Sequence, residues 1–270
     1  WCTSRMGSVM TTPKVVKELL ERSNRLGSEP RFTNYAGGNT SAKGAVPNPA
    51  TGEETTLLWV KGSGGDLGTL KESGLAALDL EKFKALKNVY RGIEFEDEMV
   101  ALFDYCRFGS SGAAPSIDTT MHGLVPFDHV DHLHPDSIIA LATSIDGEAL
   151  TRECFGEEIL WVDWRRPGFQ LGLDMAKIAT ENPNAKGCVL GGHGLTTWGA
   201  TSKECEERSI AAITKAEEFI KAKGKKDPFG AKVAKYKPLD PAARKARAAE
   251  LAPHLRGVAS KDVAMVGHFT

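Results

Sequence analysis

The sequence predicts a mixed α/β domain in which helices and strands form layers, and three observations lead to this fold class. Apolar residues recur at helical spacing in several segments, and short β-branched or aromatic runs typical of strands lie between them. The two kinds of segment alternate along the chain, an order that favours helices packed on a sheet. Hydrophobic residues make up 41% of the 270 residues and charged residues 26%, an ordinary composition for a globular enzyme.

The first half of the chain predicts helices at its start and middle, with strands between them. PKVVKELLERSNRLG has apolar residues on one helical face, with Thr12 and Pro13 at its start and Gly27 at its end. RFTNYAGGNTSAKG predicts a short strand that runs into a glycine turn, and TTLLWV predicts a second strand. Helices are expected at LDLEKFKALKNVY and FEDEMVALFDYC, and a third near Ser116.

The second half repeats the alternation. PDSIIALATS predicts a helix that begins at Pro135, and EILWVDW predicts a strand. GFQLGLDMAKIATENP is an amphipathic helix, and GCVLGGHGLTTWG predicts two strands around a glycine bend. SKECEERSIAAITKAEEFIKAK is a long helix with Ser202 as its expected N-cap.

Composition divides the chain into three parts. Residues 1–12 are expected to be an irregular leader or an expression remnant, because they lack the apolar core of a signal peptide. Residues 13–223 carry the regular alternation and form the main domain. Residues 224–270 begin with a basic, turn-rich stretch typical of a linker and continue into the short helical pattern PAARKARAAELAPHLRG. We expect the natural protein to continue past Thr270.

Charge and cysteine content exclude several classes of function. The formal net charge of −1 gives no general attraction to nucleic acid or acidic membranes. No apolar run approaches the roughly 20 residues needed to cross a bilayer. The five cysteines form no CxxC pair, so neither a disulfide framework nor a thiolate zinc site is expected. A reducing cytoplasm is the expected location.

The stretch HVDHLHPD places three histidines within eight residues, at positions 129, 132 and 134. Pro135 disfavours helical geometry at His134, so His132 and His134 are expected on extended backbone, where residues two apart share one face. His193, between glycines in GGHG, is the best candidate for a third ligand. Three imidazoles with one open position would suit a catalytic zinc ion. The alternative, that these are ordinary hydrogen-bonded structural histidines, stays open from spacing alone.

Carboxylates and glycine loops could complete such a site. Asp118, Asp128, Asp131 and Asp136 are candidates for proton transfer, and spacing alone does not choose among them. GGNTSAKG and KGSGGDLG offer backbone amides, hydroxyls and Lys61 that suit a phosphate, although both could be ordinary turns. The second loop lacks the GxGxxG and GK[ST] patterns of dinucleotide and Walker loops.

Five motifs in order, GGNTSAKG, VKGSGG, PSID, HLHPDSIIALA and GGHGL, resemble the class II aldolase/adducin family. Within it, the chain is most similar to the rhamnulose-1-phosphate aldolases that form the N-terminal half of a bifunctional aldolase/short-chain dehydrogenase. The resemblance covers roughly residues 30 to 222. It implies a three-layer αβα fold with a central, mainly antiparallel sheet, and a dehydrogenase domain that would follow Thr270.

The resemblance also assigns roles to residues. It implies that Zn²⁺ is held by His132, His134 and His193, although cobalt or manganese could substitute. Asp118 matches the family's proton-transferring glutamate, but PSID replaces a PSSE-like segment, so the side chain is one methylene shorter and Ile117 replaces one phosphate-binding serine. The implied phosphate contacts are Asn39, Gly62, Ser63 and Ser116, and Lys61 is our own addition.

The implied activity is metal-dependent cleavage of a ketose 1-phosphate, with L-rhamnulose 1-phosphate expected to give dihydroxyacetone phosphate and lactaldehyde. The expected partners are this small substrate and further copies of the chain in a homotetramer, with no nucleic acid and no membrane. Two alternatives are a sugar-phosphate 4-epimerase or dehydratase on the same metal site, and a non-catalytic adducin-like scaffold.

Overall fold

The computed structural model describes residues 12–109, 112–227, 230, 235, 237–260 and 263. The chain divides into two compact units, Trp1–Lys223 and Gly224–Thr270. Of the expected leader, residues 1–11 lie outside the described residues, as do several positions of the expected linker and all but one of residues 261–270.

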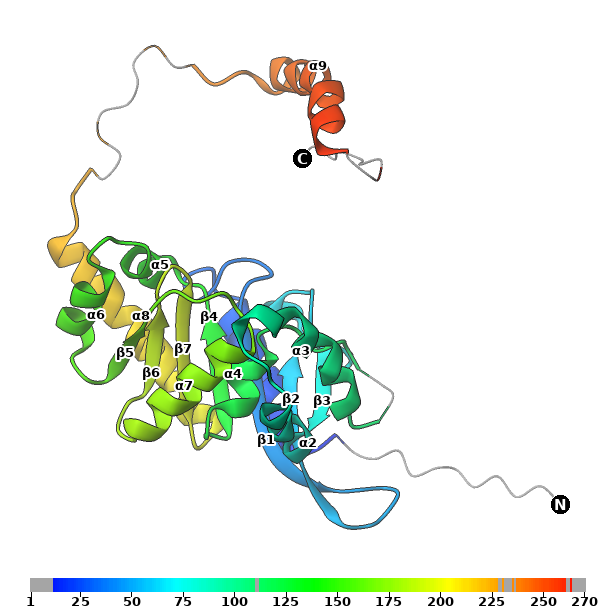
Figure 1. Ribbon diagram of the computed structural model, residues 1–270. Coiled ribbons are helices and arrows are strands. Elements are labelled where there is room, and N and C mark those ends of the chain that lie inside the picture. Colours follow the sequence, from blue (N-terminus) through cyan, green and yellow to red (C-terminus); the bar gives the residue numbers. More distant parts are fainter. Residues whose placement is uncertain are drawn as a thin grey trace. The chain divides into compact units, whose positions relative to one another are not determined.

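The described part of the first unit contains one sheet of seven strands, in the order β3-β2-β1-β4-β7-β6-β5 (Figure 1). Neighbouring strands are antiparallel except β5 and β6, which are parallel. The mainly antiparallel sheet implied by the family resemblance is therefore confirmed. The strands are β1 (Asn39–Pro47), β2 (Glu54–Lys61), β3 (Leu75–Asp79), β4 (His129–Leu133), β5 (Ile159–Val162), β6 (Gly187–Leu190) and β7 (Gly194–Gly199).

Helices cover both faces of this sheet, which gives the expected three layers. Residues of α1, α5, α6 and α8 share one buried apolar cluster with one face, for example Leu19 and Ile213 with Leu133. Residues of α2, α3, α4 and α7 pack against the other face, for example Phe83 on Leu58 and Met175 with Val130. Their bounds are α1 (Lys14–Gly27), α2 (Leu80–Ala85), α3 (Glu96–Leu102), α4 (Thr119–Leu124), α5 (Asp136–Ala142), α6 (Gly147–Phe155), α7 (Phe169–Glu181) and α8 (Ser202–Lys223).

Some element boundaries differ from the sequence expectation. The strand near residue 40 follows the glycine turn instead of preceding it, because Gly38 (φ +72°) turns the chain and β1 then pairs with both β2 and β4. The expected helix 78–90 starts only at Leu80, where the Asp79 side chain accepts from the amides of Glu81 and Lys82. β3 and α6 were not expected.

The long helix α8 begins where the sequence predicts, but its cap is a different residue. Thr201 Oγ1 accepts from the Glu204 amide at 3.1 Å and so caps the helix. The Glu204 carboxylate accepts from the amide of Ala200, the residue before this cap, at 2.7 Å. Ser202 is not the cap, because its hydroxyl accepts a hydrogen bond from Arg22 instead.

The second unit contains α9 (Pro241–Ala259), which matches the predicted helical pattern. Asp240 caps it by accepting from the Ala243 amide, and Pro241 occupies the first turn. No described residue of α9 is buried. No helix in the described part of the chain is long and apolar enough to span a membrane.

Candidate metal centre

The central strand β4 carries the first histidine of the candidate site. β4 lies between β1 and β7, and all five of its residues are buried. Side chains alternate along it, so Val130 and His132 face the α4 and α7 layer while Asp131 faces α1 and α8. His134 follows the end of this strand, and His193 lies in the bend between β6 and β7.

The structure brings the three predicted ligands together. His132 Nε2 is 2.9 Å from His134 Nε2 and 3.2 Å from His193 Nε2. One nitrogen from each ring lies within 4.8 Å of the other two. A tetrahedral ion with zinc–nitrogen bonds of roughly 2.0–2.1 Å separates its imidazole nitrogens by about 3.3 Å, so the spacing fits one bound cation.

The tautomer of His132 and the lowered pKa values of the three histidines also suit metal binding. His132 Nδ1 is 3.0 Å from the Leu195 carbonyl, an acceptor, so it carries the proton and leaves Nε2 with a lone pair directed at the other two rings. Burial lowers the pKa of His134 and of His193, and that of His132 well below its ordinary value. Neutral imidazole is the form that binds metal.

Glycines make room for these rings. A Cβ at Gly194 would lie 2.7 Å from the Leu133 carbonyl oxygen and 2.9 Å from Cδ2 of His134. The preceding bend needs φ +67° at Gly192, a backbone conformation that other residues rarely adopt. The GGHG sequence is thus explained by backbone geometry and by close packing on the histidines.

Asp118 lies beside this cluster but is not a member of the ligand group in the described part of the chain. Its negative charge raises the pKa of His134 and His193, against the larger effect of burial. Its Oδ2 accepts from Asn39 Nδ2 at 2.8 Å. Of the candidate carboxylates, Asp118 is the one whose charge acts on His134 and His193. Asp131 is paired with Arg22 on the opposite face of the strand.

The expected phosphate residues lie on two adjoining segments. Ser63 donates its amide to the Ala114 carbonyl at 3.0 Å, and a Cβ at Gly62 would lie 2.4 Å from Cβ of Ala113. The Gly62 amide donates to the Gly74 carbonyl at 2.9 Å. Both amides are already used, so any anion contact from this turn must involve other groups, such as the Ser63 hydroxyl.

Lys61 and Ser116 have features that fit an anion. Lys61 is 5% exposed, and burial lowers its pKa while Asp118 and Asp66 oppose that shift. Ser116 Oγ is buried and has no hydrogen-bond partner among the described residues. A buried hydroxyl without a partner is costly, and a bound ligand atom is one way to satisfy it. Asn39, the remaining expected contact, is hydrogen-bonded to Asp118 and His122.

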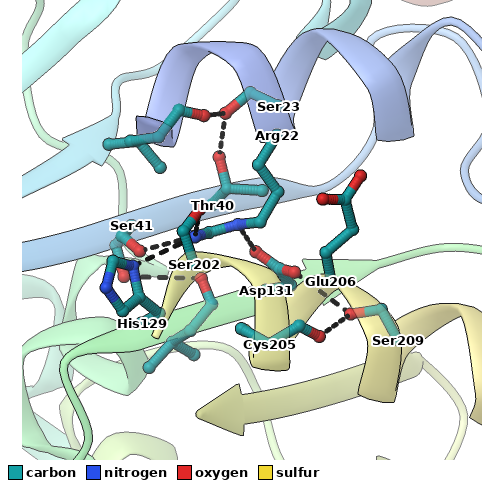
Figure 2. Close-up of polar contacts among 12 residues, drawn as sticks. Arg22, Ser23, Thr40, Ser41, His129, Asp131, Ser202, Cys205, Glu206 and Ser209 are labelled. Atoms are coloured by element: carbon teal, nitrogen blue, oxygen red, sulfur yellow. Dashed lines mark hydrogen bonds and ion pairs between the residues drawn. The ribbon is translucent and has the colours of Figure 1, made fainter. Parts of the chain in front are cut away.

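On the far side of β4 a buried polar network holds the strand in place (Figure 2). Arg22 reaches from α1 to Asp131 at 2.9 Å, and both side chains are fully buried. The same guanidinium donates to His129 Nδ1, to Ser202 Oγ and to the Ser41 carbonyl. The network thus ties α1, α8 and β1 to the strand that carries His132.

His122 is a site residue to which sequence reasoning gave little weight. It is fully buried in α4 and contacts both Asn39 and Ser41. A signal was present, since His122 follows Asp118 by four residues and such pairs share a helix face. Arg22 gave no signal, because its partners lie 19 to 180 residues away in sequence.

Known proteins resemble this chain in sequence and in fold. Residues 17–219 match the family described as Class II Aldolase and Adducin N-terminal domain. The chain is 37% identical over 255 residues to the uncharacterized oxidoreductase YuxG of Bacillus subtilis (strain 168), a match that covers 94% of this chain and 36% of that protein. The chain therefore spans about a third of the length of this curated relative.

Two solved structures show the same fold. The N-terminal class II aldolase domain of a conserved protein from Thermoplasma acidophilum has a TM-score of 0.68 and 27% identity, over 82% of this chain and 97% of that one. An L-fuculose 1-phosphate aldolase has a TM-score of 0.54 and 17% identity, over 91% and 100% of the two chains. At 17% identity the second likeness is one of fold alone.

Proposed function

Because the chain belongs to the class II aldolase and adducin family, we propose that it is a metal-dependent lyase that cleaves a ketose 1-phosphate by a retro-aldol reaction. The observation that carries this proposal is the convergence of His132, His134 and His193 beside the carboxylate of Asp118. Three imidazoles favour Zn²⁺, and Co²⁺ or Mn²⁺ are the alternatives.

The chemistry requires negative charge to be stabilised. Breaking the bond between C3 and C4 of the ketose leaves an enediolate of dihydroxyacetone phosphate. A divalent cation, when bound, supplies Lewis acidity that stabilises the charge on the substrate oxygens. Asp118 accepts the proton of the C4 hydroxyl as the C3–C4 bond breaks and C4 becomes the aldehyde carbon. It then passes this proton to C3 of the enediolate, which gives dihydroxyacetone phosphate, and the reverse transfers start the condensation. The second product is the aldehyde.

The substrate phosphate is assigned to the segments around Lys61 and Ser116. Lys61 supplies a positive charge near Asp118, and the hydroxyls of Ser63 and Ser116 supply donors. Anchoring the phosphate away from the breaking bond positions C3 and C4 by binding energy alone. The partnerless Ser116 hydroxyl supports this assignment.

We propose L-rhamnulose 1-phosphate as the substrate and lactaldehyde as the second product, on the motif resemblance. The L-fuculose 1-phosphate aldolase with the same fold acts, by its name, on a related sugar phosphate and supports the substrate class. We also propose a cytoplasmic homotetramer. The homotetramer is proposed on the family resemblance alone.

A coupled assay tests the activity. The zinc-loaded protein is incubated with L-rhamnulose 1-phosphate or L-fuculose 1-phosphate, and dihydroxyacetone phosphate is reduced by glycerol-3-phosphate dehydrogenase with NADH. We expect NADH consumption that chelation abolishes and zinc restores. Formation of an epimeric sugar phosphate or of a dehydrated product, without dihydroxyacetone phosphate, would assign the rival chemistry. If the metal-loaded protein turned over no ketose phosphate, the proposal would be wrong, and a non-catalytic, adducin-like scaffold would be the remaining alternative.

A further inference from the structure

A buried chain of hydrogen bonds leads from Ser41 through His122 and Asn39 to Asp118. We propose that His122 is a positioning residue that fixes the amide of Asn39, and through it holds the carboxylate of Asp118 for proton transfer. The role of Asp118 in this inference rests on the proposed function. The hydrogen-bond chain itself does not.

The topology explains why these four residues meet. Asp118 precedes α4 and His122 lies four residues later, so both occupy one side of that helix. Asn39 and Ser41 are two apart on β1, and therefore point to the same face of the sheet. The residue that precedes α4 and one residue within it thus meet two positions of the strand.

The contacts are short and buried. Asn39 Nδ2 lies 2.8 Å from Asp118 Oδ2, and Asn39 Oδ1 is hydrogen-bonded to His122 Nε2. His122 Nδ1 lies 2.7 Å from Ser41 Oγ. His122 and Ser41 are fully buried, and Asn39 is 6% exposed. In such a setting an unmade hydrogen bond would be costly.

The direction of every bond follows from the carboxylate. An ionised carboxylate only accepts, so Asn39 must direct its NH₂ group to Asp118 and its carbonyl oxygen to His122. The His122 Nε2 must then donate, which makes it the protonated nitrogen of the neutral ring. Burial lowers the pKa of His122 to about 3, so the ring carries only that one hydrogen. Its Nδ1 accepts from the Ser41 hydroxyl.

This arrangement compensates for a short side chain. An aspartate reaches one methylene less far than the glutamate of the family pattern, so its position matters more. The bond from Asn39 holds Oδ2 and leaves Oδ1 for the substrate. If His122 offered no donor, the Asn39 amide could turn and present its oxygen to the carboxylate, which would displace it.

Substituting His122 by glutamine or by asparagine distinguishes a positioning role from a role in packing alone. Glutamine places its amide nitrogen near the position of Nε2, so His122→Gln keeps the donor to Asn39. Asparagine reaches only the position of Nδ1, so His122→Asn keeps the contact to Ser41 and loses that donor. We measure KM, kcat, zinc content and melting temperature of both, and the metal-dependent exchange of solvent deuterium into dihydroxyacetone phosphate by NMR.

We expect His122→Asn to lower kcat and the exchange rate by about tenfold to hundredfold, with KM and zinc content unchanged. His122→Gln should retain most of both rates. Wild-type rates in a folded His122→Asn protein, or equal losses in both variants, would overturn the proposal.

A measurement without substrate keeps the inference testable if variants fail to fold or the proposed reaction is absent. The ¹⁵N shifts of histidine-labelled wild-type protein should show His122 as the neutral Nε2–H tautomer. A protonated Nδ1 would overturn the hydrogen-bond chain whatever the protein catalyses. Absence of exchange and cleavage in the wild type, together with the expected tautomer, would instead reject only the proposed function.

Discussion

At the residue scale, the carboxylate of Asp118 is the group on which the proposed chemistry depends. It lies near His134 and His193, and it accepts a hydrogen bond from Asn39. Since it is not part of the histidine ligand group among the described residues, proton transfer suits it better than metal binding.

Replacing this carboxylate by an amide should remove proton transfer and leave the metal in place. Asp118→Asn is expected to lower kcat for cleavage by about 10²–10⁴-fold, the usual contribution of a general acid or base. Zinc content, measured by atomic emission, should match the wild type. Asp128→Asn, at an exposed aspartate beside β4, is the matched control and should keep its activity. A comparable loss in the control would point to a general effect of charge.

Sequence reasoning reached part of this site and missed the rest for physical reasons. The HxH spacing before a proline implied two rings on one face, and the glycines around position 193 implied a third. The choice of Asp118 among several aspartates required the family resemblance, because spacing does not say which loops meet. The assignment of Asn39 to phosphate did not anticipate its bonds to Asp118 and His122, which depend on the meeting of β1 and α4.

At the scale of secondary-structure elements, the Arg22 network joins α1, α8, β1 and β4 behind the histidines. The ion pair between Arg22 and Asp131 is fully buried, and four hydrogen bonds from the guanidinium cross between elements. A buried pair of this kind contributes little net stability, but breaking it leaves an uncompensated charge.

We therefore expect Arg22→Met to destabilise the first unit by about 3–5 kcal/mol, measured by urea denaturation. Arg25 lies on the same helix, α1, and forms a partly exposed pair with Glu206 of α8, so Arg25→Met should cost far less. Similar losses in the two variants would show that burial of the Arg22 pair does not matter.

Element boundaries show where sequence patterns are weak. Long amphipathic helices such as α1 and α8 were predictable because their apolar periodicity extends over several turns. β3 was missed because five residues directly followed by a capped helix carry too little alternation to stand out. The strand β1 was misplaced because its residues are stabilised by pairing with β2 and β4, and pairing across the sheet leaves no local signal.

At the scale of the whole molecule, buried neutral histidines make stability depend on pH. Burial lowers the pKa of His122 to about 3 and that of His129 to about 4, with smaller effects from the charges of Lys43 and Arg22. The unfolded chain takes up protons near the ordinary value of 6.5, whereas the native protein does not until these lower values. The free energy of unfolding is therefore highest above pH 6.5, where these histidines are neutral in both states. It falls as the pH drops below 6.5, until native His129 takes up a proton near pH 4 and native His122 near pH 3.

Replacing one of these histidines should weaken the acid effect. His129→Asn keeps an acceptor for Arg22 but cannot be protonated. We expect the free energy of unfolding of the wild type to fall by about 2 kcal/mol more than that of this variant between pH 7 and 4.5. Urea denaturation at several pH values measures the difference, with His254→Asn on the exposed face of α9 as control. Parallel pH profiles for wild type and His129→Asn would contradict the assignment.

The fold class and layer order were predictable from the alternation of patterns and the family motifs, since both involve the whole length of the first unit.

The proposed chemistry requires that the three imidazoles bind one divalent cation. Metal analysis of the purified protein after zinc loading and dialysis tests it most directly. We expect one equivalent of zinc per chain in the wild type and in His254→Ala, and less than about a tenth in His132→Ala and His193→Ala. Equal zinc in all four proteins, or none in the wild type, would contradict the account.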